Sequence, residues 1–307
     1  MNDGADVKRQ VREFYDTFGW KPLAEGLYHD ARYEDLRPVS REYVRRCRLR
    51  VTPHLQPEGR YLLDGGSGPI QYSEYLEYSH GYRYRVCLDI SHLALREARS
   101  RIGDHGLFVV GDISRLPFKA DIFEGVVSMH VVYHLPREEQ ASTFREFFRV
   151  LRPSGKGVVV YSWGEHSTLM RLARFPMWVA SSLLKVYSRV RHGGQRLKDA
   201  QGKNAESEEM KGVQAPSLFS FKYDYPWLRQ QAGHLPGFEV RVWRTASSAF
   251  LRAFIYRPLF GKFWLKVLYW VEERVPHLLG RLGQYPMVLF EKPTTHSQRR
   301  VGQHHSL

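Results

Sequence analysis

Cysteine is scarce in this sequence, and so are the patterns that mark export or membrane insertion. Only Cys47 and Cys87 occur in 307 residues, without the spacing of a metal site. We therefore expect two reduced, packed thiols in a cytoplasmic protein. The first ten residues are polar, whereas a signal peptide has a basic patch followed by an apolar run. Lys or Arg interrupts each long apolar stretch before it reaches the ~20 residues that span a bilayer, so we expect no transmembrane helix.

Acidic residues are few in the second half of the chain, and positive charge gathers there. Residues 1–161 hold 24 Lys and Arg against 22 Asp and Glu, whereas residues 162–307 hold 22 against 10. Such an excess favours an anionic partner, for example a phosphate-bearing substrate, a nucleic acid or a membrane surface.

Apolar runs and helical patterns alternate between residues 60 and 162. This alternation predicts a parallel sheet with helices on both faces, in the α/β class. Two amphipathic helices, 7–15 and 41–49, precede the sheet, and we interpret the aromatic segment between them as a loop or lid. The predicted strands are 60–64, 84–89, 107–111, 125–129 and 157–162, the helices are 70–78, 92–101 and 138–151, and a turn covers 152–155.

The alternation ends after Trp163. Residues 169–190 predict an amphipathic helix interrupted by Pro176, and residues 193–216 a flexible polar loop. Two further strands, 238–243 and 286–291, bring the sheet to seven. We divide the chain into N-terminal lid helices (1–59), a core (60–162), a basic, aromatic-rich lobe (163–285), the last strand (286–292) and a disordered tail (293–307).

A glycine-rich loop, Asp64-Gly65-Gly66-Ser67-Gly68, follows the first predicted strand. Glycines let a backbone turn tightly and approach a ligand, and a helix after the loop would present free N–H groups. The second strand ends in Asp89, about 20 residues further on, the separation at which an acid binds a ribose in nucleotide-binding sheets. Asp112 follows the third strand. Because ligands of open parallel sheets bind at the carboxyl ends of the strands, we expect these acids to face one crevice.

Taken in order, these segments resemble the motifs of class I S-adenosylmethionine (SAM)-dependent methyltransferases. The glycine loop matches their D-x-G-x-G motif, Asp89 their ribose-binding acid, and Gly111-Asp112-Ile113 their adenine-binding turn. Residues 121–128 resemble the fourth-strand motif, and residues 150–157 the turn before the fifth strand, with Ser154 in place of a glycine. The resemblance covers residues 60–162. It implies a Rossmann-like, doubly wound, mostly parallel seven-stranded sheet with a helical insertion after the fifth strand.

The same resemblance implies SAM as cofactor and O- or N-methylation of a small-molecule, lipid-linked or glycan acceptor. For Asp89 and Asp112 the alternative is a carboxylate that caps the following turn. For Tyr15, and for Tyr28, Tyr33 and Arg37, the alternative is packing in the core. The implied cofactor contacts are Asp64, Gly65, Gly66, Gly68, Asp89, Ile90, Asp112, Ile113, Ser128, Met129 and Tyr15.

Two histidines, His130 and His134, follow the fourth strand, where side chains would face the transferred methyl group. Each is a candidate general base for an acceptor hydroxyl or amine, and the alternative is packing or capping of the next loop. The [DNS]-P-P-[FYW] signature of nucleic-acid amino-methylases is absent. An RNA-directed methyltransferase, an inactive SAM-binding module and a NAD- or FAD-dependent oxidoreductase remain alternatives, although Gln71 departs from the G-x-G-x-x-G loop of the oxidoreductases.

Aromatic and cationic residues alternate in the lobe, most densely in residues 250–266. Together with residues 170–191 they predict a basic amphipathic surface that binds anionic bilayers reversibly, which would put the enzyme peripherally at the inner membrane face. The alternative is a helical lid over the substrate pocket, with its apolar face buried and its charges in water.

Overall fold

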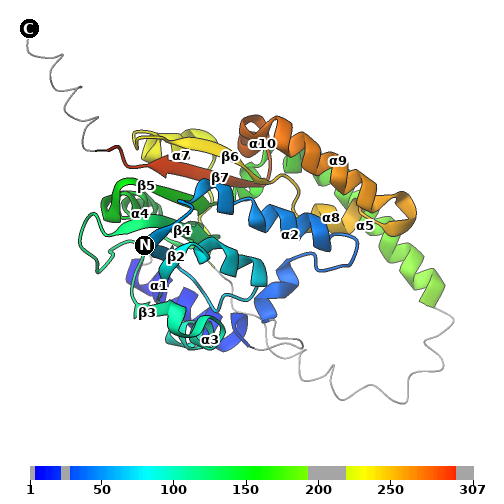
Figure 1. Cartoon of the computed structure of the whole chain (residues 1–307). Coiled ribbons are helices and arrows are strands. Elements are labelled where there is room, and N and C mark those ends of the chain that lie inside the picture. The colour runs from blue at the N-terminus through cyan, green and yellow to red at the C-terminus, as the bar shows by residue number, and fades with distance from the viewer. Residues whose placement is uncertain (1–3, 22–27, 193–218, 295–307) are drawn as a thin grey trace, which may run out of the picture.

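The computed structural model describes residues 4–21, 28–192 and 219–294, and at its centre lies a seven-stranded sheet of order β3-β2-β1-β4-β5-β7-β6 (Figure 1). The first five strands in this order run parallel, and β7 is antiparallel to both of its neighbours. The predicted mostly parallel, seven-stranded α/β sheet is therefore confirmed. The strands are β1 Gly59–Gly65, β2 Tyr82–Asp89, β3 Gly106–Val110, β4 Phe123–Met129, β5 Leu151–Val160, β6 Glu239–Arg244 and β7 Tyr285–Glu291.

Helices cover both faces of the sheet. Neighbouring strand residues point to opposite sides, and apolar side chains on each side pack against helices. Leu63 of β1 belongs to a core cluster with Phe147 and Leu228, which lie on α4 and α7. Leu62 belongs to a second cluster, with Leu265 of α9. The α-helices are α1 Gly4–Phe14, α2 Arg41–Leu49, α3 His92–Ile102, α4 Arg137–Val150, α5 Thr168–His192, α7 Tyr225–Ala232, α8 Ser248–Phe254, α9 Gly261–Arg274 and α10 Pro276–Leu282.

Short turns of other helix types connect these elements. The first, η1, is a π-helix that continues α1, and the others are 3-10 helices. They are η1 Tyr15–Gly19, η3 His29–Tyr33, η4 Thr52–His54, η5 Ser73–Ser79, η6 Gly103–His105, η7 Val132–His134, η8 Gly164–His166 and η9 Arg257–Leu259. The predicted loop at 193–216 and most of the predicted tail lie outside the described residues.

The helix predicted at 70–78 differs in its start and its type. Ile70 has a left-handed backbone (φ 52°), and helical structure begins only at Ser73, as the 3-10 helix η5. Ile70 is buried with Leu95 and Ala98 of α3, and its carbonyl oxygen accepts a hydrogen bond from Arg101 at 3.1 Å. Burial against α3 thus fixes a backbone conformation that cannot start a helix. The helix start expected directly after the glycine loop therefore lies further along the chain, at Ser73.

Two boundaries also differ from the prediction. The turn expected at 152–155 is part of β5, because Ser154, itself left-handed (φ 66°), donates its N–H to Lys292 beyond β7 at 2.7 Å. Pro176 does not interrupt α5, which continues from Thr168 to His192. Because Leu172 and Pro176 are exposed, water can reach the carbonyl group that the missing proline N–H leaves without a partner. In the described part of the chain, no helix is both long and apolar enough to cross a membrane.

Candidate active site

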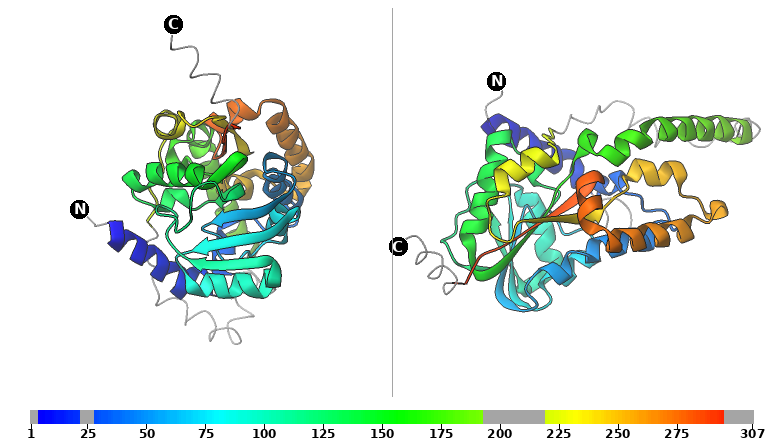
Figure 2. Two further views of the ribbon diagram at one scale, coloured as in Figure 1. Left: turned by 60° about the vertical axis from the view of Figure 1, so that its left-hand side comes forward. Right: turned by 90° about the horizontal axis from the view of Figure 1, so that it is seen from above.

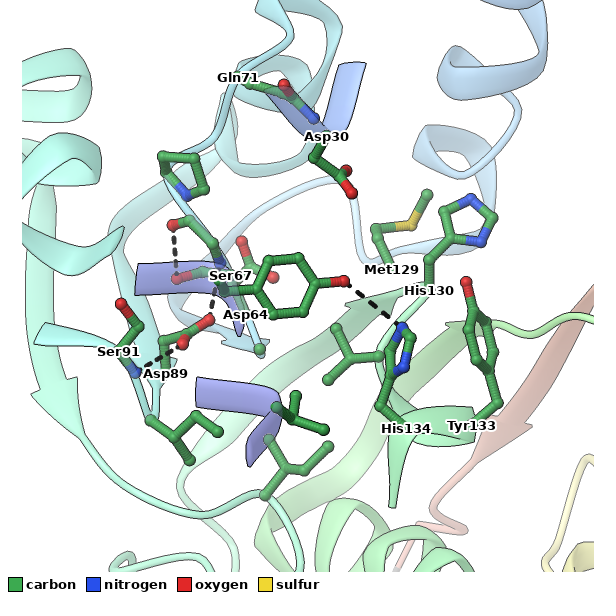
Figure 3. A pocket seen from close by; sticks show the side chains of 18 of the residues that line it. Asp30, Asp64, Ser67, Gln71, Asp89, Ser91, Met129, His130, Tyr133 and His134 are labelled. Atoms are coloured by element: carbon green, nitrogen blue, oxygen red, sulfur yellow. Dashed lines mark hydrogen bonds between the residues drawn. The ribbon is translucent and has the colours of Figure 1, made fainter. Parts of the chain in front are cut away.

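A cavity of about 530 Å³ opens at the carboxyl ends of β1, β2 and β4. Its volume is usual for a small-molecule site, for which ~300–1,000 Å³ is typical. Asp64, Asp89 and Ser91 lie toward one end of it, and Met129, His130 and Tyr133 toward the other (Figure 3). The predicted site residues that line it are Tyr15, Asp64, Gly66, Gly68, Asp89, Ile90, Asp112, Ile113, Met129, His130 and His134.

The glycine loop lies between two strand ends and leaves no room for larger residues. Gly66 donates its N–H to the carbonyl oxygen of Leu88 at 2.7 Å and has a left-handed backbone (φ 74°). A Cβ atom there would lie 2.6 Å from the methyl groups of Val131. The predicted contacts Gly65 and Ser128 are not among the residues that line the cavity. The hydroxyl of Ser128 donates to the carbonyl oxygen of Gly65 at 2.7 Å, so these two residues fix β4 to the loop.

Asp64 forms a buried ion pair with Arg85, a cavity-lining residue that sequence reasoning missed. Arg85 Nε donates to a carboxylate oxygen of Asp64 at 3.0 Å, and both side chains are almost inaccessible to solvent. Arg85 lies on β2, two residues before Cys87, the partner of Asp64 in the parallel register. The charge of Asp64 is therefore compensated within the protein, and the pair joins the ends of β1 and β2.

Asp89 ends β2 and accepts two backbone hydrogen bonds, from Gly68 at 2.9 Å and from Ser91 at 2.8 Å. Burial raises the pKa of Asp89 to about 6, even though both N–H groups act in the opposite direction. The contact with Ser91 is the capping role considered as the alternative. A carboxylate has about four lone-pair positions, so two remain for a ligand in the cavity.

Asp112 lies under α1 and is paired with Lys8, another residue that the sequence did not single out. Lys8 Nζ lies 2.6 Å from Asp112 and 3.0 Å from Glu139 of α4. Burial alone would raise the pKa of Asp112, but Lys8 and two hydrogen bonds from Ser114 lower it. These contacts fix α1 across the end of β3, with Ile113 in the cavity wall.

The η1 turn covers the glycine loop. The ring of Tyr15 stacks on Trp20 at a centroid distance of 4.8 Å, and its hydroxyl lies 3.5 Å from Nε2 of His134. A Cβ atom on Gly68 would lie 3.2 Å from the Trp20 ring. Burial raises the pKa of Tyr15 well above its ordinary value, so the hydroxyl stays protonated.

The three other residues of uncertain role in this region divide into two groups. Tyr28 is buried and donates its hydroxyl to Glu97 at 3.1 Å, and Arg37 pairs with Asp35 at 2.7 Å, so both serve packing. Tyr33 instead lines the cavity, with a side chain that is 56% exposed.

His130 follows β4 in a left-handed conformation (φ 61°), which is unusual for a residue other than glycine and costs ~1–3 kcal/mol. Its ring makes edge contacts with Trp243 at 4.7 Å and with Tyr285 at 5.3 Å. Burial, together with the charge of Arg244, lowers the pKa of His130 to about 3. The ring is therefore neutral at physiological pH, and strain of this kind is typical of functional sites.

His134 is held from both sides. Its Nδ1 lies 2.7 Å from the carbonyl oxygen of Phe219. A carbonyl can only accept, so Nδ1 donates and Nε2 carries the lone pair that faces Tyr15. Burial lowers the pKa of His134 to about 4, although the bond to Phe219 acts in the opposite direction.

A largely buried charge cluster, also missed from the sequence, forms the cavity wall near His130. Glu34 pairs with Arg244 of β6 at 2.6 Å and lies 3.9 Å from Arg48. Burial would raise the pKa of Glu34, but the two guanidinium groups outweigh it and hold the pKa at about 2. Glu34 and Arg244 are 210 positions apart in the sequence, so no local pattern predicts their contact.

Comparison with known proteins gives one family match and several structural relatives. A family model described as a methyltransferase domain matches residues 63–159. Phosphoethanolamine N-methyltransferase 1 of Haemonchus contortus, solved with phosphoethanolamine and S-adenosylhomocysteine, is 12% identical, with 95% of this chain and 50% of that chain covered and a TM-score of 0.55. No curated protein matches the sequence.

Two further structures are less similar in shape. A Thermotoga maritima SAM-dependent methyltransferase, described as a possible histamine N-methyltransferase, is 14% identical over 82% of this chain and 90% of its own, with a TM-score of 0.46. A complex of the Haloferax volcanii Trm112 methyltransferase activator with a putative methyltransferase gives 17% identity, 82% and 89% coverage and a TM-score of 0.46.

The matched segment contains the glycine loop from Asp64, the acids Asp89 and Asp112, and His130 and His134. The sheet that carries these residues has the fold of the Haemonchus enzyme. Residues 63–159 thus match a methyltransferase domain family, and the sheet around them has the fold of a solved methyltransferase.

Proposed function

We propose that this protein binds SAM and transfers its methyl group to the oxygen or nitrogen of a small-molecule, lipid-linked or glycan acceptor. The observation that carries the proposal is the Asp89 carboxylate, which is anchored by Gly68 and Ser91 and keeps lone pairs for a ligand beside the glycine loop. A ribose diol offers two hydroxyl donors to such a carboxylate.

The cofactor end of the cavity is formed by the glycine loop and the ends of β2 and β3. Gly66 and Gly68 allow close approach of a ligand, Asp89 accepts the ribose hydroxyls, and Ile90 and Ile113 supply apolar walls for an adenine ring. Trp20 and Tyr15 close this end from above. When bound, SAM supplies a methyl group on a sulfonium, which is already a good leaving group.

The acceptor end lies beside Met129 and His130, and the protein's contribution there is mainly to position the acceptor. His130 is neutral because its pKa is about 3, and its ring can accept a hydrogen bond from an acceptor hydroxyl or amine, but so low a pKa makes it a weak general base. Glu34 and Arg244 line the same end and favour an acceptor with polar groups. We assign the lobe 163–285 to acceptor binding, since Arg244 and Tyr285 come from it.

Calorimetric titration with SAM and with S-adenosylhomocysteine tests the cofactor. We expect both to bind, and a folded protein that binds neither would refute the proposal. Copurified NAD or flavin, detected by absorbance, would favour an oxidoreductase instead. Incubation with methyl-labelled SAM and separate pools of small molecules, lipids, glycans and RNA then identifies the acceptor class. Cofactor binding without label transfer to any pool would indicate an inactive SAM-binding module.

The cellular location belongs to the same proposal. Cys47 and Cys87 are both free and buried in separate parts of the core, which suits a reducing compartment. We therefore propose a cytoplasmic enzyme.

A further inference from the structure

Two helical segments of the lobe extend from the sheet at the same end of the molecule and carry large apolar side chains into solvent. Figures 1 and 2 show that α5 and the corner between η9 and α9 both project at this end. We define the apolar tip as Leu172, Phe175, Trp178 and Leu183 of α5 with Leu259, Phe260, Phe263 and Trp264 of the corner. Each of these side chains is between 56% and 76% exposed.

The α5 part of the tip belongs to a helix that is hydrogen-bonded at its start and contacts α8. Ser167 donates to Leu282 at 3.2 Å, and Met170 Sδ accepts the N–H of Ser247 at 3.5 Å. From residue 168 to 183, the part of α5 whose side chains are described, no residue is buried. The spacing of Leu172, Phe175, Trp178 and Leu183 puts them on one side of the helix. An exposed apolar patch of this kind marks a binding surface.

A left-handed residue at the corner between η9 and α9 exposes the aromatic side chains there. Phe260 has a left-handed conformation (φ 54°) and ends the η9 turn directly before α9. On α9, Leu265 is buried in the core cluster beneath the sheet, while Phe263 and Trp264 point outward. A lid over the cavity would bury these outward residues, so the lid interpretation does not account for them.

The charge around the apolar tip identifies its partner. Residues 166–198 and 240–271 contain no Asp or Glu. The exposed cations Arg171 and Arg174 accompany the α5 side chains, and Lys262 and Lys266 accompany those of the corner. Aromatic rings at the level of the lipid headgroups, with cations beside them, are the pattern of a protein surface that lies in an anionic membrane interface.

We propose that the apolar tip docks the enzyme reversibly on anionic bilayers, with Phe260, Phe263 and Trp264 in the headgroup region and the flanking cations against anionic lipids. Binding has both an apolar and an electrostatic part, so it requires anionic lipid and weakens as salt rises. This inference concerns a surface outside the cavity and does not depend on the identity of the acceptor.

Co-sedimentation of the full chain with vesicles tests the proposal. We expect binding to vesicles of phosphatidylcholine mixed with phosphatidylglycerol, little binding to phosphatidylcholine alone, and a marked loss at high salt. The triple variant Phe260→Ser, Phe263→Ser, Trp264→Ser should bind at least tenfold more weakly. Val110→Ser, which replaces an equally exposed (59%) apolar residue of β3, is its control and should bind as the wild type does. Circular dichroism melting confirms that each variant is folded.

A second pair of variants separates charge from apolar contact. Lys262→Glu with Lys266→Glu should reduce vesicle binding more than tenfold, whereas Arg60→Glu with Arg83→Glu, the same charge change at exposed positions of β1 and β2, should not. Failure of the wild type to bind the anionic vesicles, or full binding by the triple variant, would overturn the proposal. So would size-exclusion chromatography that shows a dimer which the triple variant disrupts, because the tip would then be covered by a second copy.

Discussion

Asp89 accepts a hydrogen bond from the backbone N–H of Gly68 at 2.9 Å, so the end of β2 and the glycine loop after β1 are joined before any ligand binds. The other oxygen of the same carboxylate accepts the N–H of Ser91 at 2.8 Å. The orientation of the carboxylate is thereby fixed before binding, so little conformational entropy is lost when a ligand binds to it.

Replacing Asp89 by Ala should weaken SAM binding more than tenfold, or about 1.4 kcal/mol, because two ribose hydroxyls lose their acceptor and the loop loses an anchor. Isothermal titration calorimetry measures the change directly. A folded variant with unchanged affinity would mean that Asp89 serves only as a cap for Ser91.

A pH dependence of SAM binding follows from the pKa of Asp89, which burial raises to about 6. Below this pH the carboxyl is protonated and accepts hydroxyl hydrogen bonds poorly, and above it the carboxylate is present. Affinity should therefore be constant above about pH 7 and should fall by up to tenfold per pH unit below pH 6. Titrations over this range check the prediction. In the variant Asp89→Asn the profile should be flat, and an equally steep decline there would assign the effect to another group.

His130 and His134 should give different phenotypes. His130→Ala should lower turnover and leave SAM affinity unchanged, since His130 lies at the acceptor end, whereas His134→Ala removes the partner of Tyr15 and should weaken SAM binding. Because the pKa of His130 is about 3, its neutral form predominates above that pH, and it should contribute no acid limb to kcat between pH 5 and 8. Steady-state kinetics with an identified acceptor measure both effects. Unchanged turnover would make His130 a structural residue.

The sequence predicted those parts of the site that depend on local order along the chain. A buried strand followed by an acid recurs at Asp64 and Asp89, and the parallel sheet brings such strand ends to one edge. The sequence-based prediction failed at Ile70, because the backbone conformation of this residue depends on its burial against α3, which is distant in the sequence. It also could not predict that Arg85 compensates the charge of Asp64, because that pairing depends on the register of two strands.

The pair of Glu34 and Arg244 is the clearest case of such a long-range contact, and it should stabilise the fold. Arg244→Met leaves the buried Glu34 carboxylate with a weaker partner and should lower the free energy of unfolding by about 3 kcal/mol. Arg9→Met, which breaks the exposed pair with Asp6, should change it by less than about 1 kcal/mol. Urea unfolding at neutral pH compares the two. Equal effects would show that the buried pair is no more important than the surface pair.

The same pair predicts a pH window for stability. Glu34 has a pKa of about 2 in the folded protein and about 4.3 when unfolded. Its contribution is therefore fully present above about pH 5 and is lost as the pH falls toward 2. Glu34→Gln should flatten the stability profile in this range, as measured by urea unfolding at several pH values. An unaltered profile would assign the acid sensitivity to other carboxylates.

Two glycines with positive φ should separate cofactor binding from stability. Gly66 (φ 74°) and Gly103 (φ 61°) both have a backbone that disfavours Ala, so each substitution should cost stability, by ~1–3 kcal/mol. Their surroundings differ, however. A Cβ atom at Gly66 would lie 2.6 Å from Val131 in the cavity wall, whereas a Cβ atom at Gly103 would have no atom within 4 Å apart from those of its chain neighbours. Gly66→Ala must therefore displace the loop or Val131, and SAM affinity should fall more than tenfold. Gly103 lies directly after the last residue of α3. Gly103→Ala should therefore keep wild-type SAM affinity, even if its melting temperature falls as far as that of Gly66→Ala. Calorimetric SAM titration, at a temperature where both variants are folded, tells whether affinity is lost through the shape of the loop or through general destabilisation. If Gly103→Ala lost affinity in proportion to its stability, the effect at Gly66 would reflect general destabilisation rather than the shape of the glycine loop.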